Sequence, residues 1–342
     1  MVTSIREEAF SPCIAYTGTR PVEYAAVPLT MYGSGADHLE SYTSMSALLE
    51  HFYAEKNTLT RIRQKSSDLR RIVQTALERD IKKYDLQLAQ MKDTEKREKY
   101  RIYGELLNTY GYSAKPGDRS LTAVNYYTNE PVTIPLDPTL SPTENAKKYF
   151  DKYGKLKRTY EALSSLTCQV KEEIDHLETI STALDIALKE EDLVEIKEEL
   201  TQSGYIRRKG GTKKAKITSR PFHYLSSDGF HIYVGKNNFQ NDELTFKFAT
   251  GNDWWFHAKG IPGSHVVVKT EGKELPDRTF EEAGRLAAYY SKGREQEKVE
   301  IDYVQKKQVK KPAGAKPGFV VYYTNYSLMI DSDISGIEKL SD

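Results

Sequence analysis

The sequence predicts an α+β protein in which a long antiparallel coiled-coil arm with a small tip domain precedes a compact α+β C-terminal domain. Two long segments, 47–103 and 142–188, repeat apolar residues at an average spacing near 3.5, which is typical of paired helices. Short β-type runs separated by turn residues lie between these segments and again after residue 221. We therefore expect four parts: residues 1–47, an arm over 48–200 with a middle domain at about 104–142, a basic linker over 201–220, and a domain over 221–342.

The composition limits the class of protein. At 342 residues the chain is long enough for two or three domains that each bury a core. The formal net charge of +1 conceals 29% charged residues, so any basic surface must be local. No apolar run approaches the roughly 20 residues that cross a bilayer, and the N-terminus has no leader pattern. Cys13 and Cys168 lie far apart and support neither a disulfide framework nor a zinc site. We expect a cytoplasmic protein with no membrane partner.

The first part of the chain, residues 1–47, alternates only weakly between apolar and polar residues, as in CIAYTG and VEYAAVPL. This stretch is too short to bury much apolar surface of its own. We interpret it as the remnant of a larger preceding domain, so that the chain is expected to begin inside that domain.

Each long segment carries an apolar seam in steps of three and four residues. The first seam is predicted to consist of Ile62, Leu69, Val73, Leu77, Ile81, Tyr84, Leu88 and Met91. The second is predicted to consist of Phe150, Tyr153, Leu156, Tyr160, Leu163, Leu166, Val170, Ile174, Leu177, Ile180, Leu184 and Leu188. Matching seams predict that the two helices pair, and the turn-rich insert must reverse the chain between them. Ser141, Pro142 and Glu144 form a helix-start pattern, so the second helix should begin there.

Two stretches rich in Lys and Arg flank the C-terminal domain. Their candidate phosphate-binding residues are Arg207, Arg208, Lys213 and Lys214 in the first, and Lys306, Lys307, Lys310 and Lys311 in the second. Composition favours a plain flexible linker for the first stretch, whereas the presence of a second basic stretch favours phosphate binding. Aromatic residues such as Trp254 and Trp255 are available to stack on bases of an RNA partner. The alternative is that this aromatic run belongs to the core.

The stretch 224–268 is dense in amide, histidine and aromatic side chains but shows no catalytic pattern. His231, His257 and His265 lack the spacing of metal ligands, and the stretch holds no glycine-rich phosphate loop. Ser264 is not in a nucleophile elbow. We therefore expect no enzyme, no metal site and no cofactor. The amide-rich GKNNFQND is either a recognition surface or a turn that satisfies its own backbone.

Four long motifs in this region resemble one known family. SSDGFHIYVGKNNFQNDELTFKFA, DWWFHAKGIPGSHVV, LAAYYSKGREQEKVEIDYV and VKKPAGAKPGFVVYY are similar to the RNA-binding domain of the NFACT family, to which bacterial RqcH and eukaryotic NEMF belong. The family has also been labelled fibronectin-binding protein A-like. IPLDPTLSPTENAKKYFDKYGKLKR resembles its entry to the second helix, and PVEYAAVPL the end of its N-terminal domain. On this resemblance, residues 1–47 would be NFACT-N-like and 221–342 NFACT-R-like.

The resemblance implies a role in ribosome-associated quality control. Family members bind large ribosomal subunits obstructed by peptidyl-tRNA, recruit tRNA, and support template-independent addition of C-terminal residues, chiefly alanine in bacteria, while the ribosome makes the peptide bond. The expected partners are thus the obstructed large subunit and alanine tRNA. The residues implied to face RNA, besides the basic candidates above, are Lys236, Asn237, Asn238, Gln240, Asn241, Asp242, Trp255, His257, Ser264 and His265.

One departure from the family pattern and two alternatives remain. The full N-terminal domain and its Asp-Arg pair have no counterpart here, because Asp118-Arg119 and Asp277-Arg278 lie in regions that do not match. We therefore expect a truncated or half-length protein that binds RNA or ribosome but does not select tRNA. One alternative is an adhesin that binds fibronectin or fibrinogen, as the older label suggests, although no export signal supports it. The other is a coiled-coil scaffold capped by its C-terminal domain.

Overall fold

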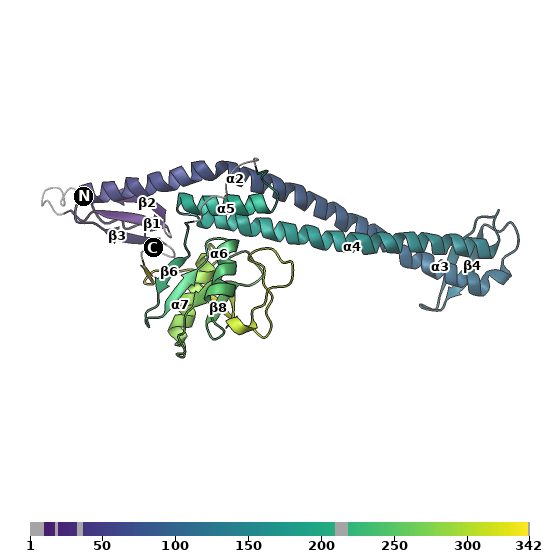
Figure 1. The fold of residues 1–342 in the computed structure, drawn as a ribbon. Coiled ribbons are helices and arrows are strands. Elements are labelled where there is room, and N and C mark those ends of the chain that lie inside the picture. Colours follow the sequence, from purple (N-terminus) through teal and green to yellow (C-terminus); the bar gives the residue numbers. More distant parts are fainter. Residues whose placement is uncertain (1–9, 18–19, 33–36, 209–217, 341–342) are drawn as a thin grey trace. The chain divides into compact units, whose positions relative to one another are not determined.

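The structure is a computed structural model that describes residues 10–17, 20–32, 37–208 and 218–340 (Figure 1). The chain divides into two compact units. One comprises Met1–Ala76 and Asp175–Asp342, and the other comprises Leu77–Ile174. Among the residues described, no helix is both long enough and apolar enough to cross a membrane.

The N-terminal residues form a small antiparallel sheet in the order β2-β1-β3, from β1 (Cys13–Thr17), β2 (Arg20–Ala25) and β3 (Asp37–Ser41). Its apolar residues do not form a core of their own. Instead, Ile14 and Tyr16 pack against Leu48 and Phe52 of the first long helix, α2 (Met45–Thr94). The segment therefore gains its burial from the helix, and its interpretation as a domain remnant stays a prediction.

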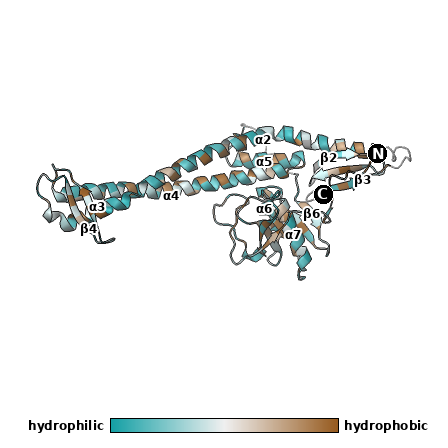
Figure 2. Cartoon of the chain, turned by 180° about the vertical axis from the view of Figure 1, so that it is seen from behind, coloured by the Kyte–Doolittle hydropathy of each residue, from teal (hydrophilic) through white to brown (hydrophobic). Residues whose placement is uncertain are grey.

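The long helices α2 and α4 (Pro142–Ile186) contact each other in both units. Within residues 77–174, the Thr167 hydroxyl lies 3.5 Å from the Met91 sulfur, and the Arg97 guanidinium lies 4.0 Å from the centre of the Tyr160 ring. In the other unit, Arg70 bonds to Asp185. From Met91 on α2 to Arg97 on the following helix, α3 (Arg97–Tyr110), the partner on α4 moves back from Thr167 to Tyr160, so the pairing is antiparallel, as predicted. Figure 2 shows these helices as mainly hydrophilic ribbons interrupted by hydrophobic residues.

The predicted seam is wrong at three positions. Ile81, Leu88 and Leu166 are exposed, whereas the polar neighbours Asp80, Gln87 and Thr167 are buried in their place. The reason is register. Buried positions on α2 alternate in steps of four and three residues from Ile62 to Asp80, and Gln87 follows seven residues later. This spacing places polar residues in the seam, while the apolar Ile81 and Leu88 fall one position later.

A small middle domain lies within residues 77–174. It contains α3 (Arg97–Tyr110), the 3₁₀ turn η1 (Gly111–Ser113) and a hairpin of β4 (Ser120–Asn125) and β5 (Glu130–Pro135). Leu106, Ile134 and Tyr149 form its core with their neighbours. The predicted helix start is confirmed: α4 begins at Pro142, the Glu144 N–H donates to the Ser141 hydroxyl, and the Ser141 N–H donates to the Glu144 carboxylate.

The C-terminal domain is built on a seven-stranded antiparallel sheet in the order β11-β10-β8-β9-β7-β6-β12. The strands are β6 (Phe222–Leu225), β7 (His231–Val234), β8 (Trp254–Ala258), β9 (Val266–Val268), β10 (Val299–Gln305), β11 (Tyr326–Ile330) and β12 (Glu338–Leu340). Between strands lie the short α-helix α6 (Asn238–Glu243), the π-helix η2 (Leu244–Phe248) and the 3₁₀ helix η3 (Lys306–Gln308).

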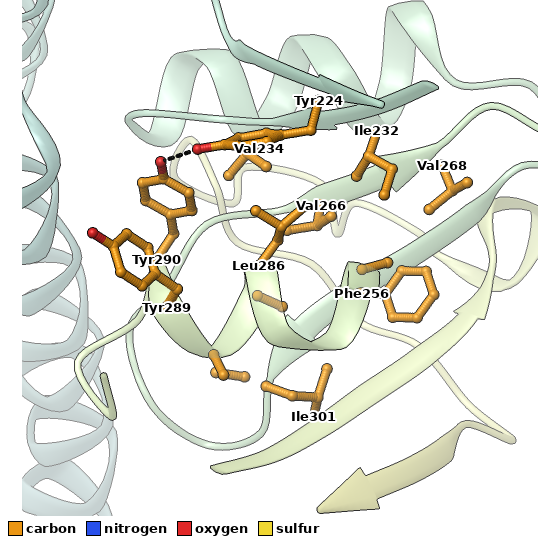
Figure 3. Packing of buried hydrophobic residues seen from close by; sticks show 14 of the residues in the cluster. Tyr224, Ile232, Val234, Phe256, Val266, Val268, Leu286, Tyr289, Tyr290 and Ile301 are labelled. Carbon is orange, nitrogen blue, oxygen red and sulfur yellow. Dashed lines mark hydrogen bonds between the residues drawn. The ribbon is translucent and has the colours of Figure 1, made fainter. Parts of the chain in front are cut away.

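Two layers cover this sheet. Helix α7 (Asp277–Tyr289) packs on one face, where Phe256, Val266 and Leu286 belong to the main core, and the Tyr224 and Tyr290 hydroxyls bond to each other at 2.6 Å (Figure 3). On the other face, Trp255 packs with Leu244 of η2. The predicted α+β fold class is confirmed.

Candidate nucleic-acid interface

The GKNNFQND segment, residues 235–242, is named here the amide turn. Its side chains first satisfy its own backbone: the Asn237 amide oxygen accepts from the Gln240 N–H at 3.0 Å and caps α6, and the Gln240 amide oxygen accepts from the Lys236 N–H. The Asn241 amide oxygen accepts from the His265 N–H at 3.0 Å. The alternative interpretation of this motif as a self-satisfying turn is therefore correct for the Asn237 and Gln240 bonds, whereas Asn241 binds the backbone of a neighbouring segment.

The remaining amide donors bind carboxylates of α5 (Glu190–Gln202), a helix of the same unit. The Asn237 and Gln240 amides both donate to Glu195 Oε2 at 2.7 Å, and the Asn238 amide donates to Glu199 Oε1 at 2.7 Å. All three amide residues are buried. In this arrangement the amide N–H groups already donate to carboxylates of the same chain. A direct contact of these amides with RNA stays a prediction, and it would require the amide turn to separate from α5.

Burial shifts the proton equilibria of this contact. It raises the pKa of Glu199 to about 8 and raises the pKa of Glu195 as well. His176 Nε2 lies 3.7 Å from Glu199 Oε1, and burial lowers the pKa of His176 to about 4. Both shifts favour the uncharged forms, which weakens any ion pair between these two side chains. Beside it, Lys236 Nζ lies 3.4 Å from Asp192 Oδ1, and both side chains are buried.

Trp255 and His265 are core residues in this structure. Trp255 has no exposed surface, so it cannot stack on a base, and the core alternative holds for Trp255 and Phe256. His265 bonds to the Thr245 hydroxyl at 2.8 Å, and burial lowers its pKa. His257 is half-buried, and burial lowers its pKa to about 4. Ser264 is buried, and within the described chain neither its hydroxyl nor the Trp255 indole N–H has a hydrogen-bond partner.

The basic candidates lie in different environments. Lys311 forms an ion pair with Asp242, whose other oxygen accepts from the Gly318 N–H at 3.0 Å, so these two candidates fasten the lysine-rich loop to α6. Lys307 and Lys310 are exposed, and Lys306 is half-buried. Exposed cations are the groups that can reach phosphates.

The first basic stretch is only partly described. Arg207 is exposed, and Arg208 forms an ion pair with Glu198 of α5. Lys213 and Lys214 lie outside the described residues. The structure thus brings the amide turn together with Ser264, His265 and Lys311, and Arg208 pairs with the same helix, α5, that the amide turn contacts.

Sequence reasoning missed the acidic face of α5. Asp192, Glu195 and Glu199 follow one another at helical spacing, which places them on one side of the helix. This spacing is a signal that was present in the sequence. Charged residues on a helix usually face solvent, however, and only the buried amides reveal why these carboxylates do not.

The chain matches known proteins along nearly all of its length. Residues 1–219 match the NFACT N-terminal and middle domains, and residues 220–323 match the NFACT protein RNA binding domain. The Rqc2 homolog RqcH of Streptococcus suis is 41% identical over 90% of this chain and 55% of its own length. The homolog of the same name from Bacillus subtilis is 34% identical over 99% of this chain and 59% of its own length. The chain therefore spans little more than half the length of these curated relatives.

A solved structure agrees with this similarity. The C-terminal part of the fibronectin/fibrinogen-binding protein from Streptococcus suis superposes with a TM-score of 0.65 and 36% identity, over 81% of this chain and 99% of that one. Both family matches, the curated relatives and the fold lead to the same conclusion. The chain belongs to the NFACT family.

Proposed function

We propose that this chain acts in ribosome-associated quality control, in the cytoplasm, by binding obstructed large ribosomal subunits and tRNA. Its role is to support template-independent alanine tailing of stalled nascent chains, while the ribosome itself makes the peptide bond. The observation that carries the proposal is the match of residues 220–323 to an RNA-binding domain, joined to relatives named as Rqc2 homologs. The exposed Lys307 and Lys310 supply charge for phosphate contacts.

The adhesin alternative is less well supported. Its support is the printed name of the superposed structure, which describes that protein as fibronectin/fibrinogen-binding. The domain matched here is described as RNA-binding, and no feature of the described surface points to a matrix protein.

The test is binding to purified large subunits over a range of salt concentrations. The proposal expects affinity to fall steeply as salt rises, because each phosphate contact releases counterions. The double variant Lys307→Glu, Lys310→Glu should weaken binding and flatten the salt dependence. Lys298→Glu, an exposed lysine of the same domain, is the control for charge reversal and should bind like the unaltered chain. Salt-resistant binding to immobilised fibronectin without affinity for RNA or subunits would contradict the proposal.

A further inference from the structure

A pocket of about 500 Å³ lies at one edge of the C-terminal domain, away from the amide turn. Its lining includes Asn252, Trp254, Lys273, Asp277, Phe280 and Gln305. These residues come from β8, the end of β10, the first turns of α7 and the loops beside them. A volume of this size is in the range of small-molecule sites, and the lining joins aromatic rings with amide and charged groups.

Trp254 forms a rigid aromatic wall of the pocket. Its backbone is fixed in the sheet, opposite Val268 on β9 and Gln305 on β10. Its ring meets Phe280 edge to face with 4.8 Å between centroids and lies 5.8 Å from Tyr303. Trp255 points into the opposite layer and is buried, whereas Trp254 is only half-buried. An indole held in one position beside an open pocket is a stacking platform for a flat ligand.

The amide side chains that line the pocket are available for hydrogen bonds to a ligand. Within the described residues, the side chains of Asn252 and Gln305 make no hydrogen bond to the chain, in contrast to every amide of the amide turn. An amide offers both a donor and an acceptor, which is the combination that reads the edge of a base. Glu274 and Asp277 in the same lining add acceptors. Acceptors favour bases with an exocyclic amino group, that is adenine, cytosine and guanine over uracil.

One lysine, Lys273, lines this pocket, and the backbone of a lysine pair is bonded to the loop beside it. The Lys306 N–H donates to the Asp253 carbonyl at 2.8 Å, and the Lys307 N–H donates to the Gly251 carbonyl at 3.1 Å. These bonds join the lysine pair to the loop that carries Asn252. The exposed Lys307 is therefore joined through its backbone to the loop that carries Asn252, where its charge is available to a phosphate outside the pocket, while the two carboxylates in the lining disfavour a phosphate inside it.

We propose that this pocket binds one unpaired nucleobase of single-stranded RNA, stacked on Trp254, read by Asn252 and Gln305, with the adjoining phosphate on Lys307. The inference rests on the proposed function, since it names the RNA feature that the RNA-binding domain would hold. It requires an unstacked base, because a base inside a duplex cannot enter a pocket of this kind.

Tryptophan fluorescence gives the direct test. The chain has two tryptophans, of which Trp255 is fully buried, so quenching by added RNA reports on Trp254. Short oligonucleotides of adenine or cytosine should quench the signal to saturation, and oligouridine should bind several-fold more weakly. The variants at position 254 lose this reporter, so their affinity is measured by the fluorescence anisotropy of a labelled oligonucleotide. In that assay Trp254→Leu should cost about tenfold in affinity, the loss expected for one stacked base, whereas Trp254→Phe should retain most of it.

A second variant protects the test against misfolding. Asn252 is exposed, so Asn252→Ala should leave the fold intact, and together with Gln305→Ala it should reduce the preference for adenine and cytosine over uracil. Unchanged oligonucleotide affinity in folded Trp254→Leu would overturn the pocket assignment. Salt-dependent binding to large subunits would then still support the proposed function, and loss of subunit binding with oligonucleotide binding intact would contradict that function alone.

Discussion

The unaltered chain should lose folding stability as the pH rises, because the buried Glu199 ionises at the contact between α5 and the amide turn. The substitution Glu199→Gln should remove this loss. Glu199 is buried, one of its oxygens accepts from the Asn238 amide, and the other has no partner in the described part of the chain. Glutamine has the same shape and can still accept from Asn238, but it cannot ionise. The substitution therefore changes the charge chemistry and little else.

The magnitude follows from the pKa of the buried carboxyl. Burial raises it from 4.5 to about 8. Each tenfold change in proton affinity is worth about 1.4 kcal/mol, so the full difference reaches about 5 kcal/mol. This is an upper limit, because water can reach the carboxylate once it ionises. The pKa of Glu199 is higher in the folded chain than in the unfolded chain. The resulting contribution to the free energy of unfolding is therefore fully present below pH 4.5 and is lost as the pH rises through 8.

Urea unfolding from pH 5 to pH 9 measures the effect as the difference between variant and unaltered chain. Taking the difference cancels His257 and His265, whose lowered pKa values destabilise the fold as the pH falls below 6.5. His176 lies 3.7 Å from Glu199 and does not cancel, but its lowered pKa confines its effect to pH values below 6.5. The variant should be similar in stability at pH 5 and several kcal/mol more stable at pH 9. Glu191→Gln, at an exposed position of the same helix, should show no such trend. A difference that stays flat with pH would refute the buried contact.

Three further predictions concern the paired helices and the activity. Ser141→Ala should lower the free energy of unfolding by about 1 kcal/mol, because α4 loses its capping box, and an unchanged melting temperature would contradict the cap. Leu88 is exposed, so Leu88→Gln should change the free energy of unfolding by less than about 0.5 kcal/mol. Val73 is buried, so Val73→Ala should cost about 1 kcal/mol or more. Equal losses in urea unfolding would mean that Leu88 lies in the seam, as the sequence predicted. This chain alone should not sustain alanine tailing in a reconstituted assay, and robust tails made by it would show that the expected tRNA-selecting domain is dispensable.

Local signals in the sequence predicted the local structure. Ser141, Pro142 and Glu144 fixed a helix start because the capping bonds join residues only three apart. The hairpin of β4 and β5 likewise follows from turn residues beside it. The seam of α2 was harder to predict, because two neighbouring residues of a helix point in different directions and either could face the partner helix. Only the partner helix decides that Gln87 is buried and Leu88 is exposed.

The candidate interface could be predicted only in part. Which side chains are exposed depends on the alternation along a strand and on partners that lie far away in the sequence. Trp254 and Trp255 are adjacent and chemically equal, yet β8 sends them to opposite faces of the sheet, and only Trp254 borders an open pocket. The amide turn was predicted from its composition. Its partners, Glu195 and Glu199, lie about forty residues earlier in the chain, and no local pattern connects the two.

The two roles considered for the amide turn lead to opposite outcomes for one pair of variants. If its amides serve the contact with α5, Asn238→Ala leaves the buried Glu199 without its donor and lowers the free energy of unfolding by about 1–3 kcal/mol. RNA affinity of the folded protein should then stay unchanged. Lys307→Glu should do the reverse, since an exposed lysine contributes little to stability but contacts phosphate. Urea unfolding and an oligonucleotide titration on both variants separate the cases. Loss of RNA affinity in a stable Asn238→Ala variant would mean that the amides leave α5 to bind RNA.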